Sequence, residues 1–112
     1  MEFIEATPFT QHLEDFLSDD QYRELQTLLL LSPTEGDVIQ GTGGFRKLRW
    51  ADTRRGKGKR GGLRVIYYFF ESTHLIWMLS IYDKNTVDDL SSTQKKALKA
   101  ALDREKKARR IL

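Results

Sequence analysis

The chain has 112 residues, the size of one domain, and 39% of them are hydrophobic, which suffices for one modest core. It contains no cysteine, which excludes disulfides and any cysteine-based nucleophile or metal site. The first residues lack the basic and apolar regions of a secretory signal, and no apolar run is long enough to span a bilayer. We therefore expect one soluble domain, residues 1–112, that works in the cytoplasm without a membrane.

The formal net charge of +3 conceals a strong segregation of charge along the chain. Residues 1–45 carry nine acidic residues and one arginine, a net charge of −8, whereas residues 46–64 carry nine Lys or Arg and one Asp, a net charge of +8. Residues 65–94 have a net charge of −3 and residues 95–112 a net charge of +6. So dense a basic segment suggests a polyanionic partner. A solvated basic loop is the alternative that applies to any run of charges.

The N-terminal part of the chain predicts a strand followed by two helices. A short alternating run at residues 2–6 predicts the strand. Thr7 is expected to be an N-cap, with Pro8 as the first helical residue, and apolar residues follow at helical spacing. Ser18 and Gln21 match a capping box that begins the second helix. The two helices are expected to form a hairpin.

A glycine-rich stretch and a basic strand follow. Residues 33–44 lack the Gly-Lys-Ser/Thr ending of a phosphate-binding loop, so their glycines are expected to form a turn that leads into a strand. Residues 45–51 alternate as that strand, with Lys47 and Arg49 on one face. Residues 53–62 contain no apolar anchor and are expected to form a flexible loop.

The remaining chain predicts a hairpin and a helix. Residues 63–71 and 75–82 read as two strands that pair in antiparallel fashion around a turn at 72–74. A helix with a weak apolar face and a basic face is expected from about Ser92 onward. The order β-α-α-β-β-β-α predicts an α+β domain with a mostly antiparallel sheet, an N-terminal helical hairpin and a C-terminal helix.

The predicted hairpin brings Arg64 roughly opposite Tyr82, with Lys84 close to both. An arginine inside an apolar strand is costly unless it has a functional or a carboxylate partner, and its planar guanidinium suits a phosphate. Tyr82 is expected either to stack on a nucleobase or pass a proton, or simply to end a core strand. We therefore expect this end of the sheet to hold an RNA phosphodiester.

RNA cleavage requires removal of a proton from a 2′-hydroxyl, stabilisation of a phosphorane and protonation of the 5′-oxygen. Fixed cations can lower much of this barrier. Lys57 and Lys59 lie among other cations, which lower the pKa of a lysine and favour it as a base. His12 and His74 lie in different elements and are expected to be ordinary surface residues. The sequence predicts neither a metal site nor a cofactor.

The segments GDVIQGTGGFRKLR (36–49), GKGKRGGLRVIYYF (56–69) and IYDKN (81–85) resemble the RelE/HigB family of type II toxins, and the HigB-like branch in particular. The resemblance covers most of the chain. It implies a RelE-like fold and an mRNA interferase that cleaves mRNA in the ribosomal A site by 2′-hydroxyl attack, without metal or cofactor. It also implies a tightly bound antitoxin, expected to be a HigA-like protein with a helix-turn-helix DNA-binding fold.

The resemblance also implies roles for individual residues. Arg64 matches the strand arginine that contacts the scissile phosphate. Lys57 and Lys59 fall in the region of the catalytic lysines, and Lys47 and Arg49 are competing candidates. The residues expected to bind the RNA backbone are basic: Arg46, Lys47, Arg49, Arg54, Arg55 and Arg60.

Two departures from the family pattern leave the proton-transfer residue open. Asn85 replaces an arginine of the family, which leaves Lys84 as the nearby cation. The C-terminal tyrosine of the best-known members has no counterpart, so Tyr82 is the expected substitute. Two other functions are considered: a non-enzymatic poison of the same fold that acts on a protein such as gyrase, and a ribosome- or RNA-binding module.

Overall fold

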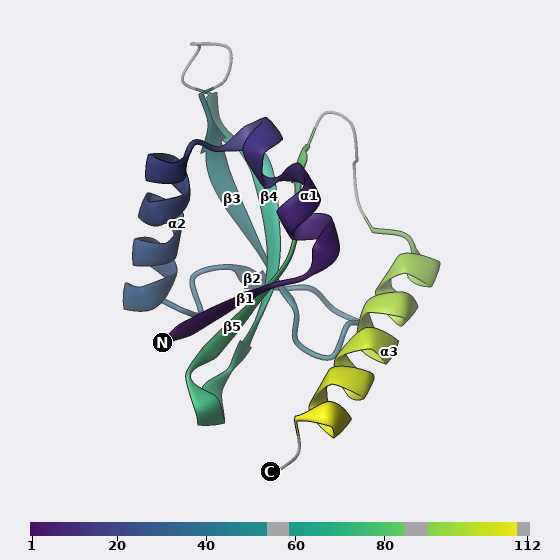
Figure 1. Cartoon of the computed structure of the whole chain (residues 1–112). Coiled ribbons are helices and arrows are strands. Elements are labelled where there is room, and N and C mark those ends of the chain that lie inside the picture. Colours follow the sequence, from purple (N-terminus) through teal and green to yellow (C-terminus); the bar gives the residue numbers. More distant parts are fainter. Residues whose placement is uncertain (54–58, 85–89, 110–112) are drawn as a thin grey trace.

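A computed structural model describes residues 1–53, 59–84 and 90–109, with residues 59–61 described by their backbone alone. Five strands form one sheet in the order β1-β5-β4-β3-β2 (Figure 1). Their bounds are β1 Glu2–Glu5, β2 Asp37–Val38, β3 Arg46–Asp52, β4 Lys59–Phe70 and β5 Leu75–Asp83. β1 pairs with β5 in parallel and the other neighbours are antiparallel, so the predicted α+β class and mostly antiparallel sheet are confirmed.

A helical hairpin of α1 (Thr7–Phe16) and α2 (Asp19–Leu31) precedes the sheet's central strands in the chain. The capping box is present, since the Ser18 hydroxyl accepts from the N–H of Gln21 while the Gln21 side chain accepts from the N–H of Ser18. The prediction of Thr7 as N-cap was wrong. Ala6 takes that position, because its carbonyl accepts the first helical hydrogen bonds, from the N–H groups of Phe9 (3.0 Å) and Thr10 (3.1 Å).

The sheet buries side chains on both faces, with a helical layer over each (Figure 1). Over one face, α1 and α2 contribute residues such as Phe9 and Leu25 to a core with Val65 and Tyr67 of β4. Over the other face, α3 (Ser92–Ala108) contributes Leu102 to a smaller core with Phe45, Ile66 and several partly buried aromatic residues. We call these the hairpin face and the α3 face. β4 supplies buried residues to both cores, which explains why every residue from Val65 to Phe70 is aliphatic or aromatic.

The glycine-rich stretch forms the predicted turn before β3. Gly41, Gly43 and Gly44 have φ angles of +83°, +84° and +121°, and residues other than glycine rarely adopt such positive values. The buried Thr42 fixes the turn, because its hydroxyl donates to the carbonyl of Ile39 (2.7 Å) and accepts from the N–H of Phe45 (3.1 Å). The two-residue strand β2 within this stretch was not predicted.

The expected loop at residues 53–62 is shorter than predicted. β4 begins at Lys59, whose Cα lies across from that of Asp52, and the irregularity between Trp50 and Asp52 accommodates the extension. A ladder of backbone hydrogen bonds needs no apolar side chains, so the glycines and cations at the start of β4 gave no strand signal. Residues 54–58 lie outside the described residues.

The turn between β4 and β5 is a short 3-10 helix, Glu71–Thr73, followed by His74 in the left-handed region at φ 50°. A second capping box, between Ser91 and Gln94, begins α3. Among the described helices, none combines the length and the apolar character that crossing a membrane requires.

Candidate RNA-binding site on the α3 face

Three adjacent strands place their residues in a common row at the end of the sheet away from the β4–β5 turn. Arg64 of the central strand lies directly across from Arg49 of β3 on one side and from Tyr82 of β5 on the other. The predicted opposition of Arg64 and Tyr82 is therefore confirmed. In the next row, Lys47 lies across from Ile66.

The side chains of these rows start from the α3 face of the sheet. Ile66 is buried in the core beneath α3, and residues two apart along a strand share a face. Arg64 is therefore on that face, as are its cross-strand partner Arg49 and, one row away, Lys47. Sequence alternation had placed Lys47 and Arg49 together, and the register confirms it.

A β-bulge sets this register. Next to the turn, Phe70 lies across from Leu75, and the same register continues as far as Tyr67 and Met78. Leu79 of β5 is then skipped, so that Ile66 lies across from Ser80. Without the skipped residue Arg64 would face Ile81. Bulges of this kind commonly aim side chains next to functional sites.

Two like charges face each other in this arrangement. Arg49 is exposed and Arg64 half-buried, and directly opposed cations in an antiparallel pair repel one another. Asp83 lies across from Leu63, which belongs to the hairpin-face core, so its carboxylate starts from the opposite side of the sheet. The row thus concentrates positive charge on one face.

The position of Tyr82 favours a structural role. The residue is half-buried and packs in the α3-face core, a cluster that also holds Leu90 and Leu98. Its hydroxyl oxygen is shielded from solvent. Lys84, by contrast, is exposed just beyond β5, where its N–H donates to the carbonyl of Gly62 (3.1 Å).

Arg46 lies on the opposite face from the row. It is across from Tyr67 of the hairpin-face core, and its guanidinium Nη1 donates to the carbonyls of Thr34 (3.2 Å) and Gly36 (2.8 Å). The same segment is held by Tyr67, whose hydroxyl donates to the carbonyl of Pro33 (2.8 Å) and accepts from the N–H of Gly36 (2.9 Å). Arg46 is therefore better explained as a structural residue than as the RNA contact that the sequence suggested.

The remaining predicted residues belong to the basic segment before β4. Lys57, Arg54 and Arg55 lie outside the described residues. Lys59 and Arg60 form the first two positions of β4, with Lys59 across from Asp52, and only their backbone is described.

Sequence reasoning missed Ser80, which lies across from Ile66 in the row that contains Lys47. The available signal was a hydroxyl that follows five apolar residues of β5 and stands two positions before Tyr82.

The two histidines lie in separate elements and do not form a common site. His12 is exposed on α1, with Nδ1 3.5 Å from a carboxylate oxygen of Asp15, and His74 is exposed in the β4–β5 turn. In the described part of the chain, no group of three or more His, Asp or Glu side chains is placed to hold a metal ion.

No protein-family profile matches the sequence. Solved structures do match the fold. The isolated E. coli RelE toxin is 15% identical with a TM-score of 0.53, and the match covers 89% of this chain and 97% of that one. A chain of the intact E. coli RelBE toxin–antitoxin complex is 15% identical with a TM-score of 0.52, and the match covers 73% of this chain and 94% of that one. A double arginine-to-alanine mutant of E. coli RelE in the free state is 14% identical with a TM-score of 0.52, and the match covers 78% of this chain and 86% of that one. The chain therefore has the fold of the RelE toxin, as the resemblance implied.

Proposed function

We propose that this chain is the toxin of a type II toxin–antitoxin system and cleaves mRNA in the A site of the ribosome. The observation that carries the proposal is the direct opposition of Arg49 and Arg64 on the α3 face, with Lys47 in the adjacent row. Like charges directly opposite each other in a sheet repel, and an anion that binds beside both side chains lowers that repulsion. A phosphodiester is such an anion, and a RelE-like fold makes RNA its expected source.

The proposed chemistry is intramolecular transesterification. The 2′-oxygen loses its proton and bonds to phosphorus, and the bond from phosphorus to the 5′-oxygen breaks, which leaves a 2′,3′-cyclic phosphate and a 5′-hydroxyl end. Arg64, with Arg49 beside it, would stabilise the phosphorane charge from fixed strand positions. Strand residues hold such groups more accurately than loop residues do.

The proton transfers require a base and an acid near this row. Lys47 starts from the same face one row away and is the best-placed described lysine, and Lys84 is exposed beyond β5. Lys57 and Lys59 stay candidates from the sequence. Tyr82 would support Arg64 by packing rather than carry a proton, because its hydroxyl is shielded from solvent. A cytoplasmic antitoxin would neutralise the toxin by covering this face.

The test is inducible expression followed by primer extension on a translated message. The wild-type chain should arrest growth and produce codon-linked cuts, and Arg64→Ala and Arg49→Ala should remove both effects. Arg23→Ala is the matched control, since Arg23 is an exposed cation on α2 whose ion pair with Asp20 (3.3 Å) contributes little. Growth arrest without cuts would refute the nuclease and favour a poison of another target. Absence of both effects would favour a binding module.

A further inference from the structure

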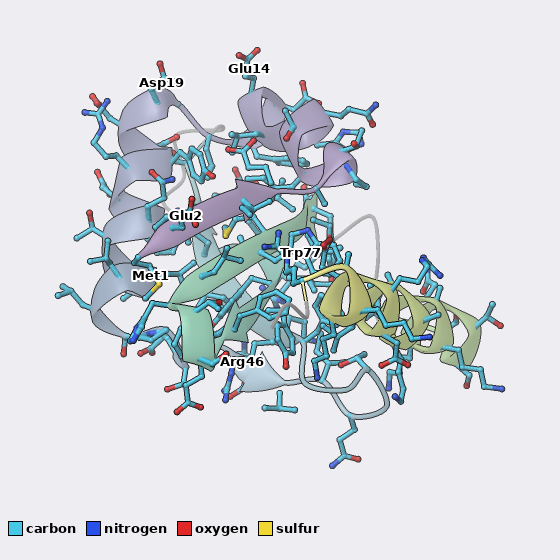
Figure 2. All side chains as sticks on the ribbon, turned by 60° about the horizontal axis from the view of Figure 1, so that its bottom comes forward. Met1, Glu2, Glu14, Asp19, Arg46 and Trp77 are labelled. Carbon is cyan, nitrogen blue, oxygen red and sulfur yellow. The ribbon has the colours of Figure 1, made fainter. Side chains whose placement is uncertain are left out.

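The helix α3 carries more positive charge than its packing role explains. Seventeen residues, Ser92–Ala108, include six Lys or Arg and two acids, for a net charge of +4. Its apolar contribution to the core consists chiefly of the buried Leu102 and the partly buried Leu98. Figure 2 shows nitrogen-tipped side chains along the outward side of this helix.

Three cations lie along the outward side of α3, which we call the ridge, and the exposed acid Asp103 lies among them, about 20° from Lys96. At about 100° per residue, Lys96 and Lys107 point within about 20° of each other, Arg104 lies about 60° to one side of Lys107, and all point away from Leu102. All three are exposed. At about 1.5 Å per residue, the ridge from Lys96 to Lys107 is about 16 Å long.

Few of these charges are neutralised within the protein. Nζ of Lys99 is 3.4 Å from a carboxylate oxygen of Asp103, but both side chains are more than half exposed, so this pair is weak. Over the described residues, Lys96, Arg104 and Lys107 take part in no ion pair. A ridge of unneutralised cations on a well-capped helix is suited to an external polyanion.

The chemistry of the ridge favours nucleic acid over protein. Protein interfaces depend on buried aromatic or aliphatic anchors, whereas phosphate contacts need only cations. The apolar side chains on the exposed part of α3 are alanines, such as Ala97 and Ala100. The ridge therefore has charge without anchors, which suits an RNA backbone.

The ridge also adjoins the candidate site. The N-terminal part of α3 contributes Leu98 to the cluster that contains Tyr82, and Lys95 packs beside Gly41 in the turn that leads into β3. From there the helix runs toward the β4–β5 turn, where Nζ of Lys106 lies 5.5 Å from the ring centroid of Tyr68. The helix that carries the ridge therefore packs against the same face of the sheet as the candidate site.

We propose that the exposed ridge of α3, formed by Lys96, Arg104 and Lys107 with Lys99 beside them, is a second RNA-binding surface that holds the backbone of structured RNA outside the cleavage site. The proposal rests on the proposed function and adds an anchoring surface to it. The ridge supplies affinity and orientation, while the row around Arg64 supplies the chemistry.

The test measures binding separately from cleavage. The probe is an RNA stem-loop with 2′-O-methyl riboses, which removes the attacking hydroxyl and prevents cleavage. The variant is Lys96→Gln/Arg104→Gln/Lys107→Gln, because glutamine matches lysine and arginine in helix propensity. In about 50 mM KCl the variant should bind at least about 10-fold more weakly than the wild-type chain. Between about 50 and 200 mM KCl, the slope of log K against log[KCl] should be shallower by about 2–3 in the variant.

Two controls isolate the ridge. Lys96→Arg/Lys107→Arg keeps the charge and should bind as the wild type does. Arg23→Gln removes one cation from the acidic hairpin and should leave the slope unchanged. An unchanged slope in the triple variant would overturn the proposal. An equal loss of binding to polyglutamate and to the stem-loop would also overturn it, since that result marks a surface for acidic proteins.

The outcomes separate this inference from the proposed function. If the triple variant loses RNA binding but the wild-type chain never cuts a translated message, the ridge stands and the nuclease fails. If the wild-type chain cuts and the triple variant cuts with unchanged concentration dependence and unchanged salt slope, the nuclease stands and the ridge fails.

Discussion

The opposition of Arg49 and Arg64 has a measurable cost in stability. Their Cα atoms are direct partners in an antiparallel ladder, which places such atoms about 4.5–5.5 Å apart. Two unit charges about 6 Å apart repel by about 0.7 kcal/mol in bulk water and about 3 kcal/mol at an effective dielectric constant of 20. Because Arg49 is exposed, the lower figure applies, and it agrees with the 0.2–1 kcal/mol typical of cross-strand pairs.

A double-mutant cycle measures this repulsion. Arg49→Gln, Arg64→Gln and the double variant are unfolded with urea at low salt, and the coupling free energy is taken from the four unfolding free energies. The cycle cancels the other contacts of Arg64, so it reports the pair alone. We expect a repulsive coupling of about 0.5 kcal/mol that becomes small in 1 M KCl, where the screening length is about 3 Å.

An anion should relieve the repulsion. At constant ionic strength, inorganic phosphate should stabilise the wild-type chain more than Arg49→Gln, because binding to the folded state raises the free energy of unfolding. A coupling that is zero or attractive at low salt would refute the reasoning. It would show that the fold already separates the two guanidinium groups, and the main support for a phosphate site on this row would be lost.

Three further predictions concern residues around the site. Tyr67→Phe should lower the free energy of unfolding by about 1–3 kcal/mol in urea melts, because the buried N–H of Gly36 and the partly buried carbonyl of Pro33 lose their partner, while RNA cleavage persists. Gly43→Ala should destabilise by at least about 1 kcal/mol, since φ is +84° and the new Cβ would lie 3.1 Å from Leu102; an unaltered melt would contradict the tight turn. The pKa of Tyr22 is raised above its usual 10.0, mainly by burial of the side chain and also by the carboxylate of Glu5. The folded state therefore holds the hydroxyl proton more tightly than the unfolded state does. The resulting contribution to the free energy of unfolding is complete below pH 10 and falls as the pH rises above it. Tyr22→Phe should therefore lose less stability than the wild-type chain in alkaline urea melts.

Local sequence signals predicted the elements that fix themselves locally. The capping box at Ser18 correctly located the start of α2, because it is completed within four residues, and the helix predicted from about Ser92 is α3. β2 and the first residues of β4 were missed because they are held by backbone pairing with β3, and their own side chains carry no periodic signal. Thr7 was misassigned because Ala6, the residue between β1 and α1, already supplies the capping carbonyl.

The Arg64–Tyr82 register was predicted correctly through two deviations that cancel. The sequence suggested that the strands begin to pair one residue nearer the turn than they do, and the structure begins with Phe70 across from Leu75. The bulge before Ser80 then restores the expected pairing at Arg64. Alternation alone cannot reveal a bulge, because a skipped residue leaves the apolar pattern of a two-sided strand nearly unchanged.

The arrangement of charge across the sheet explains how a small protein can present one face to RNA. The hairpin that covers one face holds most of the acids of residues 1–45, and Figure 2 shows Glu14 and Asp19 projecting outward from it. The opposite face holds Arg49, Arg64 and the cations of α3. A phosphate backbone is repelled by the first surface and attracted by the second, so the field of the protein orients it before any contact forms. If both proposals hold, the cleavage row and the α3 ridge meet the RNA together, since both belong to the positively charged side of the sheet.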